Sequence, residues 1–123
     1  MFQITVELTF DAAHFLRGYR GKCEAVHGHH FKVAVKLNAE KLNEIGITYD
    51  FTDVKRHLNS ILSRLDHTLL NDLPPFDMIN PSSENLAVTI FNEMKPKLEG
   101  EPVKLVSVEV WETGQQGVAY MPA

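Results

Sequence analysis

Two stretches of the chain alternate between apolar and polar residues. Over residues 2–10 the apolar side chains share one parity, and residues 27–38 repeat the pattern. The apolar positions of the second stretch are Phe31, Val33, Val35 and Leu37. A period of two indicates β-strands with one buried face. If the first strand continues without a bulge, His14 falls on its apolar side, and His27 and His29 share the apolar parity of the second.

A stretch after the second strand has the spacing of an amphipathic helix. A short extended segment is expected over residues 47–51, and Thr52 is the expected N-cap, with Asp53 in the first turn. The apolar residues that follow stand at positions i, i+4, i+7, i+8 and i+11 and are Val54, Leu58, Ile61, Leu62 and Leu65. The helix is expected to end near Asp66 and His67.

The second half of the chain predicts another helix and two more strands. Prolines 74, 75 and 81 indicate a long loop before a helix that begins at Ser82 or Ser83. Pro96 is expected to disturb the last turn of that helix. Strands are predicted over residues 103–112 and 117–121.

The element order ββααββ predicts one α+β domain over residues 1–123, in which two helices cover one face of a four-stranded antiparallel sheet. The other face carries Thr5, Glu7, Lys32 and Lys36. This face is too polar for a second core, so it is expected either to contact solvent or to line the wet interior of an oligomer.

Composition excludes several functional classes. The formal charge of −4 argues against a nucleic-acid partner, whose phosphates would need a basic face. The chain has no apolar stretch of about 18 residues, so no membrane span is expected. One cysteine forms no internal disulfide, which fits the cytoplasm. Arg17, Arg20 and Lys22 form a local basic cluster.

The sharpest chemical signal is the run from Cys23 to His29. His27 and His29 lie two residues apart on a strand, so their imidazoles reach one face, and His14 ends the neighbouring strand. Three histidines without a fourth protein ligand indicate a catalytic zinc site with an open position. Cys23 is a candidate base or nucleophile, although free cysteines are often small buried apolar residues. His30 has the opposite parity and is left out of the site.

Two acidic groups each have a structural and a chemical interpretation. Glu112 ends a strand on its apolar side, where an unpaired carboxylate is costly, so it is a candidate ligand-binding group rather than a surface charge. Asp66 and His67 could simply end a helix, or they could form a proton relay in which the carboxylate orients the imidazole.

These residues together match one family. The chain resembles the 6-pyruvoyl-tetrahydropterin synthase / 6-carboxytetrahydropterin synthase family from end to end. The match is carried by Cys23 before His27-Gly28-His29, the earlier His14, the pair Asp66 and His67, residues 80–87 (NPSSENLA) and Glu112 with Thr113. The three residues between Cys23 and His27 are similar to the short spacing of the bacterial carboxy-forming branch of the queuosine pathway.

The resemblance implies a tunnelling fold whose subunits associate into barrels, as a homo-oligomeric trimer or hexamer with active sites at subunit interfaces. It implies zinc on the three histidines and a dihydropterin triphosphate as the small-molecule substrate. Glu112 would bind the pterin edge, and the basic cluster would receive the triphosphate. Asp66 and His67 would then relay protons with Cys23, in some arrangements toward a neighbouring subunit's zinc.

The implied reaction is the conversion of 7,8-dihydroneopterin triphosphate to 6-carboxy-5,6,7,8-tetrahydropterin, acetaldehyde and triphosphate. The nearest alternative is the pyruvoyl synthase reaction, which eliminates triphosphate without breaking a carbon–carbon bond. An aldolase-like step toward folate is less favoured, because relatives with that role are expected to carry Glu at the position of Cys23. A zinc-stabilised module without turnover is the alternative from another class.

Overall fold

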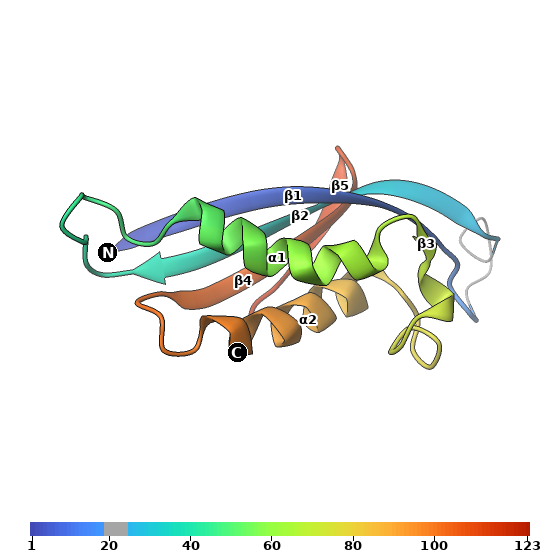
Figure 1. The fold of residues 1–123 in the computed structure, drawn as a ribbon. Coiled ribbons are helices and arrows are strands. Elements are labelled where there is room, and N and C mark those ends of the chain that lie inside the picture. Colours follow the sequence, from blue (N-terminus) through green and yellow to red (C-terminus); the bar gives the residue numbers. More distant parts are fainter. Residues whose placement is uncertain (19–24) are drawn as a thin grey trace.

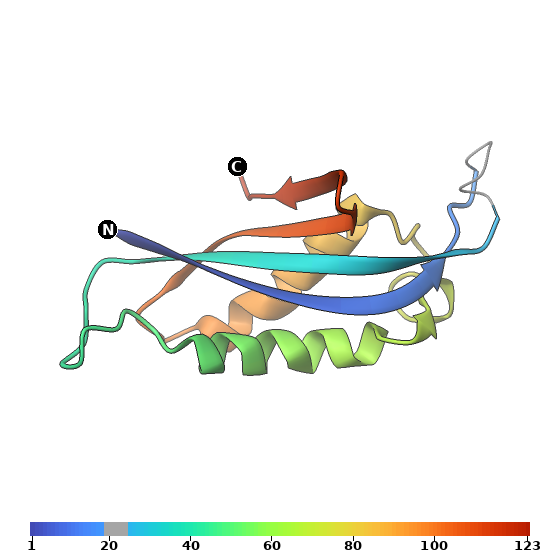
Figure 2. The same cartoon turned by 90° about the horizontal axis from the view of Figure 1, so that it is seen from above.

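The computed structural model describes residues 1–18 and 25–123 as a twisted sheet with two helices on one face (Figures 1 and 2). The strands are β1 (Phe2–His14), β2 (His27–Ala39), β3 (Thr68–Leu69), β4 (Lys104–Thr113) and β5 (Gln116–Tyr120). The helices are α1 (Phe51–Leu65) and α2 (Ser83–Met94), with short 3₁₀ segments at Leu70–Asp72 and Lys95–Leu98.

The sheet order is β3-β1-β2-β4-β5, and every pairing except β3 with β1 is antiparallel. The predicted α+β fold with two helices on an antiparallel sheet is confirmed. The strand count is five rather than four, because Thr68–Leu69 adds a parallel pair beside Ala12 and Ala13. Two residues are too few to show a period of two, so hydrophobic patterning could not reveal β3.

The hairpin of β1 and β2 carries the histidines. Its register runs from Phe2 opposite Ala39 to His14 opposite His27 without a shift. The strand therefore contains no bulge, and the apolar parity predicted for residues 2–10 extends to His14 as expected. β1 continues past residue 10 to His14, and β2 begins at His27 as predicted, so the paired ends with His14 and His27 lie together at one end of the molecule, on the right in Figure 1.

The start of α1 differs from the prediction. Phe51 already belongs to the helix rather than to an extended segment, and the N-cap is Asp50, not Thr52. The Asp50 carboxylate accepts a hydrogen bond from the Thr52 amide at 2.8 Å, which satisfies one of the free donors of the first turn. Both residues are good caps, and only the backbone geometry distinguishes them. α2 begins at Ser83, one of the two expected positions, and the Ser82 hydroxyl caps it by accepting from the Asn85 amide at 3.1 Å.

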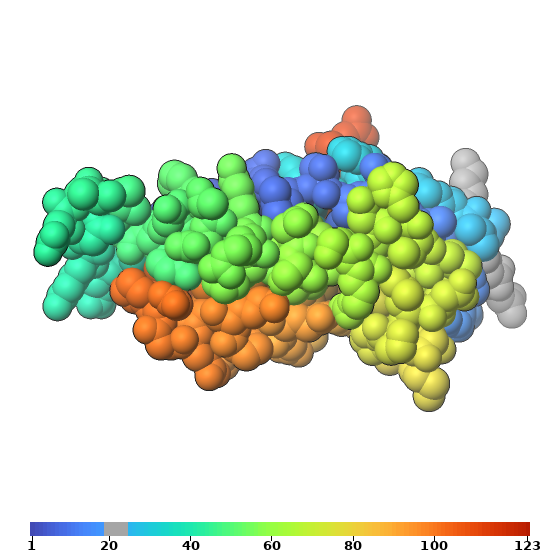
Figure 3. Space-filling view, viewed as in Figure 1, coloured from blue at the N-terminus to red at the C-terminus, as the bar shows by residue number. Residues whose placement is uncertain are grey.

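The core lies between the sheet and the helices. α1 packs along β1, and α2 packs along β4 and β5. The large fully buried side chains include Phe10, Phe31, Leu37, Leu58, Leu65, Leu86, Ile90 and Met94. The segment between the helices forms a lobe over the right-hand end of the molecule (Figure 3). Among the described helices none is long and apolar enough to cross a membrane.

The opposite sheet face is polar, as predicted. Lys36 Nζ lies 2.9 Å from the Glu109 carboxylate, which also accepts from the Trp111 indole at 3.0 Å. The hydrogen bond from Lys36, followed by that from Trp111, lowers the pKa of the Glu109 carboxyl. Lys32 lies over the Trp111 ring, 5.1 Å from its centroid. Trp111 thus packs on the polar face of the sheet.

Trp111 also covers Gly117, its cross-strand neighbour on β5. A Cβ atom at Gly117 would meet the indole ring, with Trp111 Cγ only 2.7 Å away. We therefore expect Gly117→Ala to destabilise the protein by about 1–3 kcal/mol, because the ring must move off its packing position. Urea unfolding measures this change. Gly114→Ala is the matched control, since a Cβ there meets nothing within 4 Å. Equal stability of the two variants would contradict this packing.

Candidate metal centre

Three histidines converge at the shared end of β1 and β2. The register places His14 opposite His27 and Ala12 opposite His29. All three imidazoles therefore lie on the helix side of the sheet, with ring centroids 4.6 Å (His14–His27), 5.3 Å (His14–His29) and 4.8 Å (His27–His29) apart. One candidate ligand atom from each ring lies within 4.8 Å of the others. The structure thus brings together the residues that the sequence selected.

Main-chain carbonyls determine which ring nitrogens are free. His14 Nδ1 lies 2.7 Å from the Pro81 carbonyl oxygen, and His27 Nδ1 lies 2.8 Å from that of Ala25. A carbonyl only accepts, so each Nδ1 carries a proton, and in the neutral form of each ring Nε2 presents a lone pair. This arrangement, in which the second nitrogen of a ligand is held by a carbonyl, is typical of metal-binding histidines.

The burial of His14 supports a metal partner. Within the described residues, its Nε2 atom is buried and has no hydrogen-bond partner. Burial lowers the pKa of the His14 imidazole below its ordinary value, against the raising effect of the hydrogen bond to Pro81. The ring is therefore neutral, which is the form that binds zinc. A buried lone pair without a donor, next to two further imidazoles, fits a zinc ion with three nitrogen ligands.

Glu112 of β4 reaches the same centre. Its carboxylate oxygens lie 4.0 Å from His14 Nε2 and 3.8 Å from His29 Nε2. They are held by the Ser83 hydroxyl at 3.0 Å and the Gln116 amide at 3.2 Å. Beside them, Ser83, Glu84, Glu112, Gln116, Gly117 and Val118 line a small open pocket of about 200 Å³. A carboxylate held between the histidines and a pocket can bind a donor group of a ligand that enters there.

Asp66 and His67 form the expected pair but lie elsewhere on this end. Asp66 Oδ2 is 2.9 Å from His67 Nδ1, and Asp66 Oδ1 accepts from the Asp11 amide at 2.9 Å. The Asp11 amide, and to a lesser extent the His67 ring, lowers the pKa of the Asp66 carboxyl. His67 has a φ of 58° and its amide donates to the Asp11 carbonyl at 2.6 Å.

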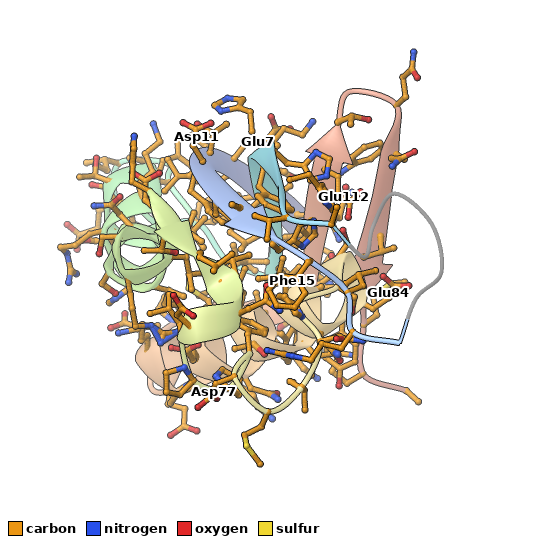
Figure 4. All side chains as sticks on the ribbon, turned by 90° about the vertical axis from the view of Figure 1, so that its right-hand side faces the viewer. Glu7, Asp11, Phe15, Asp77, Glu84 and Glu112 are labelled. Atoms are coloured by element: carbon orange, nitrogen blue, oxygen red, sulfur yellow. The ribbon has the colours of Figure 1, made fainter. Side chains whose placement is uncertain are left out.

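The pair faces away from the chain's own histidines. Asp11 has the opposite parity to His14, and its carboxylate lies 2.7 Å from His30 Nδ1 on the polar sheet face. In Figure 4 Asp11 and Glu112 lie at different sides of the same end. The His67 side chain is 78% exposed. Its imidazole is therefore accessible to a molecule outside this chain, and His30 takes no part in the cluster of three, as predicted.

Comparison with known proteins places this site in a family. The family model for 6-pyruvoyl tetrahydropterin synthase matches residues 3–123. The chain belongs to this family. A 6-carboxy-5,6,7,8-tetrahydropterin synthase of Synechocystis is 36% identical over 98% of this chain and 93% of its own length. A dihydroneopterin monophosphate aldolase of Pyrococcus furiosus is 33% identical over 94% of both chains.

The solved structures of the 6-pyruvoyl tetrahydropterin synthase family agree. The enzyme of Caenorhabditis elegans superposes with a TM-score of 0.84 at 28% identity and covers 100% of this chain and 98% of its own. The resemblance read from the sequence is thereby confirmed, as is the tunnelling-type α+β fold. The chain is a member of a family of pterin-converting enzymes.

Of the basic cluster of Arg17, Arg20 and Lys22, the structure describes only Arg17. Arg20, Lys22 and Cys23 lie outside the described residues. The Arg17 guanidinium donates to three main-chain carbonyls of the loop before α2, those of Phe76 at 3.0 Å, Ile79 at 3.3 Å and Asn71 at 3.5 Å. Its donors are thus turned toward the protein, which sequence reasoning did not anticipate.

Two asparagines of the segment between the helices, Asn71 and Asn80, make contacts that were not predicted, although Asn80 belongs to the run 80–87 that carried the family resemblance. Asn71 and Asn80 bind the main chain just after His14, through both atoms of each side-chain amide. Asn71 is only 5% exposed. An asparagine in a proline-rich loop usually signals a turn, so no sequence pattern pointed to these contacts.

Proposed function

We propose that this chain is a 6-carboxy-5,6,7,8-tetrahydropterin synthase. It would be a zinc-dependent lyase that converts 7,8-dihydroneopterin triphosphate and water to 6-carboxy-5,6,7,8-tetrahydropterin, acetaldehyde and triphosphate, in the biosynthesis of queuosine. The observation that carries the proposal is the cluster of His14, His27 and His29 with a buried free nitrogen in a pterin synthase fold. The similarity to the Synechocystis enzyme of that name supports it.

His14, His27 and His29 would hold the zinc ion, which acts when bound as a Lewis acid toward the hydroxyl groups of the substrate side chain. Glu112 would orient the substrate. Its carboxylate lies between the histidines and the pocket, and it can accept from the 2-amino group and N3–H of a pterin side by side. The substrate side chain would then extend toward the histidines.

Cys23, Asp66 and His67 would move the protons. The Cys23 thiolate would remove a proton from the substrate side chain, and His67, oriented by Asp66 at 2.9 Å, would return one elsewhere. Glu24 and Lys22 flank Cys23 in the sequence, and a neighbouring cation favours the thiolate. Together these steps would eliminate triphosphate and place a carbonyl where the side-chain carbon–carbon bond can break.

The accessible relay pair favours a homo-oligomer with shared sites. His67 is exposed and Asp11 beside it faces the polar sheet side, so the pair is placed to serve the metal centre of a neighbouring subunit. A trimer or hexamer would enclose the polar face in a hydrated barrel. We expect the enzyme to act in the cytoplasm, where its one cysteine stays reduced.

A second candidate activity is an aldolase reaction on a dihydroneopterin phosphate. The similarity of the chain to the dihydroneopterin monophosphate aldolase of Pyrococcus furiosus supports this activity. The presence of Cys23, rather than the Glu expected of relatives with that role, argues for the carboxy synthase. The pyruvoyl synthase reaction would use the same residues and stop after triphosphate elimination.

Product analysis tests the proposal. The purified zinc-loaded protein is incubated with 7,8-dihydroneopterin triphosphate, and the products are identified by mass. The carboxy synthase yields 6-carboxy-5,6,7,8-tetrahydropterin and acetaldehyde. A 6-pyruvoyl product without acetaldehyde, or a 6-hydroxymethyl pterin with a phosphorylated glycolaldehyde, would replace the proposed activity by one of the alternatives.

Arg20 and Lys22 are proposed to receive the triphosphate, whereas the Arg17 guanidinium donates to main-chain carbonyls of the protein itself. Because a hydrogen bond to a charged group contributes about 1.5–3 kcal/mol, Arg20→Ala should raise KM about tenfold or more. Steady-state kinetics measure this, and Arg56→Ala, an exposed residue on α1, is the control. We expect Arg17→Ala to affect stability as well, since its guanidinium holds the loop carbonyls. An unchanged KM in Arg20→Ala would remove Arg20 from the phosphate site.

A further inference from the structure

Two asparagine side chains extend β1 beyond its last residue, His14. The Asn71 amide donates to the Phe15 carbonyl and accepts from the Phe15 amide, both at 3.0 Å. The Asn80 amide does the same with Arg17, accepting from its amide at 2.8 Å and donating to its carbonyl at 2.9 Å. Each asparagine thus binds both the amide and the carbonyl of one main-chain residue, as a neighbouring strand would, and the two bound residues, Phe15 and Arg17, lie two apart.

The loop that carries these asparagines also touches the metal centre. Pro81 follows Asn80 directly, and its carbonyl oxygen is the partner of His14 Nδ1 at 2.7 Å. The Asn80 carbonyl accepts from the Asn85 side chain at 2.9 Å. The peptide before Pro81 is therefore held from two directions, by the side chain of Asn80 on Arg17 and by Asn85 of α2.

These contacts close a ring around His14. Its main chain leads to Arg17, Arg17 is bound by Asn80, and Asn80 is bonded to Pro81, which orients the imidazole of His14. The His14 side chain is only 1% exposed, and the bond from Nδ1 to the Pro81 carbonyl is its one hydrogen bond among the described residues, so this carbonyl helps to set the direction of the ring. A ligand ring held in direction binds a metal more tightly than one that rotates freely.

We propose that Asn80 is a positioning residue of the metal centre and that it sets the affinity for zinc through Pro81 and His14. This inference rests on the proposed zinc site but not on the identity of the reaction. Asn80 would touch neither the metal nor the substrate. Its role would be to keep the Pro81 carbonyl within hydrogen-bond distance of His14, as Asn85 does from the other side.

Zinc affinity measured by competition with a chromophoric chelator tests the proposal without substrate. Removing an outer partner of a metal ligand typically weakens binding 10–100-fold. Asn80→Ala loosens that partner, the Pro81 carbonyl, without removing it, so the variant should raise the Kd for zinc about tenfold, at the low end of this range. Asn85→Ala, which removes only the bond to the Asn80 carbonyl, should raise it by a smaller factor. Asn92→Ala, on the exposed surface of α2, is the matched control and should leave Kd unchanged.

Circular dichroism of the metal-free variants separates positioning from folding. The measurement is made at a temperature at which wild type and variants are all folded, so that loss of structure does not lower the apparent affinity. Weaker binding in folded Asn80→Ala and Asn85→Ala supports the proposal. An unchanged Kd in folded Asn80→Ala overturns it, and if that variant does not fold, an unchanged Kd in Asn85→Ala overturns it instead.

The wild type distinguishes this proposal from the function on which it rests. Wild-type protein that binds zinc while Asn80→Ala binds it equally well would overturn only the positioning role. Wild-type protein that binds no zinc would overturn the metal centre itself, and this inference with it. A wild type that binds zinc but makes none of the expected pterin product would leave the positioning role supported by the affinities alone.

Discussion

His27→Ala is expected to strip the metal from the protein. The variant keeps His14 and His29 but loses one of the three nitrogens that converge at the end of β1 and β2. Even the loss of an outer hydrogen bond weakens metal binding 10–100-fold, so the loss of a direct ligand should weaken it by more than about a hundredfold. Zinc content after dialysis, measured by mass spectrometry, gives the result.

His30→Ala is the control for that experiment. His30 lies in the same strand, three residues from His27, but bonds Asp11 on the polar face. It should retain zinc at the wild-type level, close to one ion per subunit. If His30→Ala lost zinc and His27→Ala kept it, His30 rather than His27 would be the third ligand. Full retention in both variants would contradict the three-histidine site.

Cys23→Ala is expected to abolish turnover while the metal stays in place. If the thiolate removes a substrate proton, its loss should lower kcat about a thousandfold, within the 10²–10⁴-fold range of general acid–base catalysis. Zinc content should remain near one per subunit, because the histidines alone hold the ion. Product formation from 7,8-dihydroneopterin triphosphate and metal analysis on the same sample test both statements.

Asp66→Asn serves as the companion variant for Cys23→Ala. The amide keeps the size of the carboxyl group and still accepts from the Asp11 amide, but it no longer stabilises a charged His67. It should retain zinc and lose much of its turnover. Loss of zinc in Cys23→Ala would make the thiol a ligand instead of a base, and full turnover in that variant would exclude it from the chemistry.

Hydrophobic periodicity was enough to place the three histidines of the candidate metal centre on the core side of the sheet. Side chains of a strand alternate between the two faces of the sheet, and β1 and β2 keep this alternation without a shift over their full length. The positions of His14, His27 and His29 on the core side therefore followed from counting residues. Their convergence also required the hairpin register that sets His14 opposite His27, which the pattern alone does not determine.

Other features depend on contacts that no local pattern records. The cap at Asp50 instead of Thr52 depends on backbone angles at the start of α1. The two residues of β3 form a strand only because β1 lies beside them. The bonds from Asn71 and Asn80 to the chain after His14 span more than 50 residues, so they could be found only in the folded molecule.

The role of Arg17 shows the same limit. Its charge and its neighbours in the sequence suggested a phosphate ligand, whereas in the fold its guanidinium donates to loop carbonyls. Those carbonyls belong to a segment that the chain reaches only after α1. Charge in a sequence thus indicates what a side chain can bind, and the fold decides which partner is within reach.

A crystal structure of the zinc-loaded protein, with anomalous diffraction at the zinc edge, would show directly whether the three histidines bind the ion. We expect one anomalous peak with three imidazole nitrogens at about 2.0–2.1 Å and a fourth position taken by solvent or substrate. Glu112 should stay hydrogen-bonded to Ser83 and outside the coordination sphere. A peak elsewhere, or a fourth protein side chain bound to the metal, would contradict a catalytic zinc site.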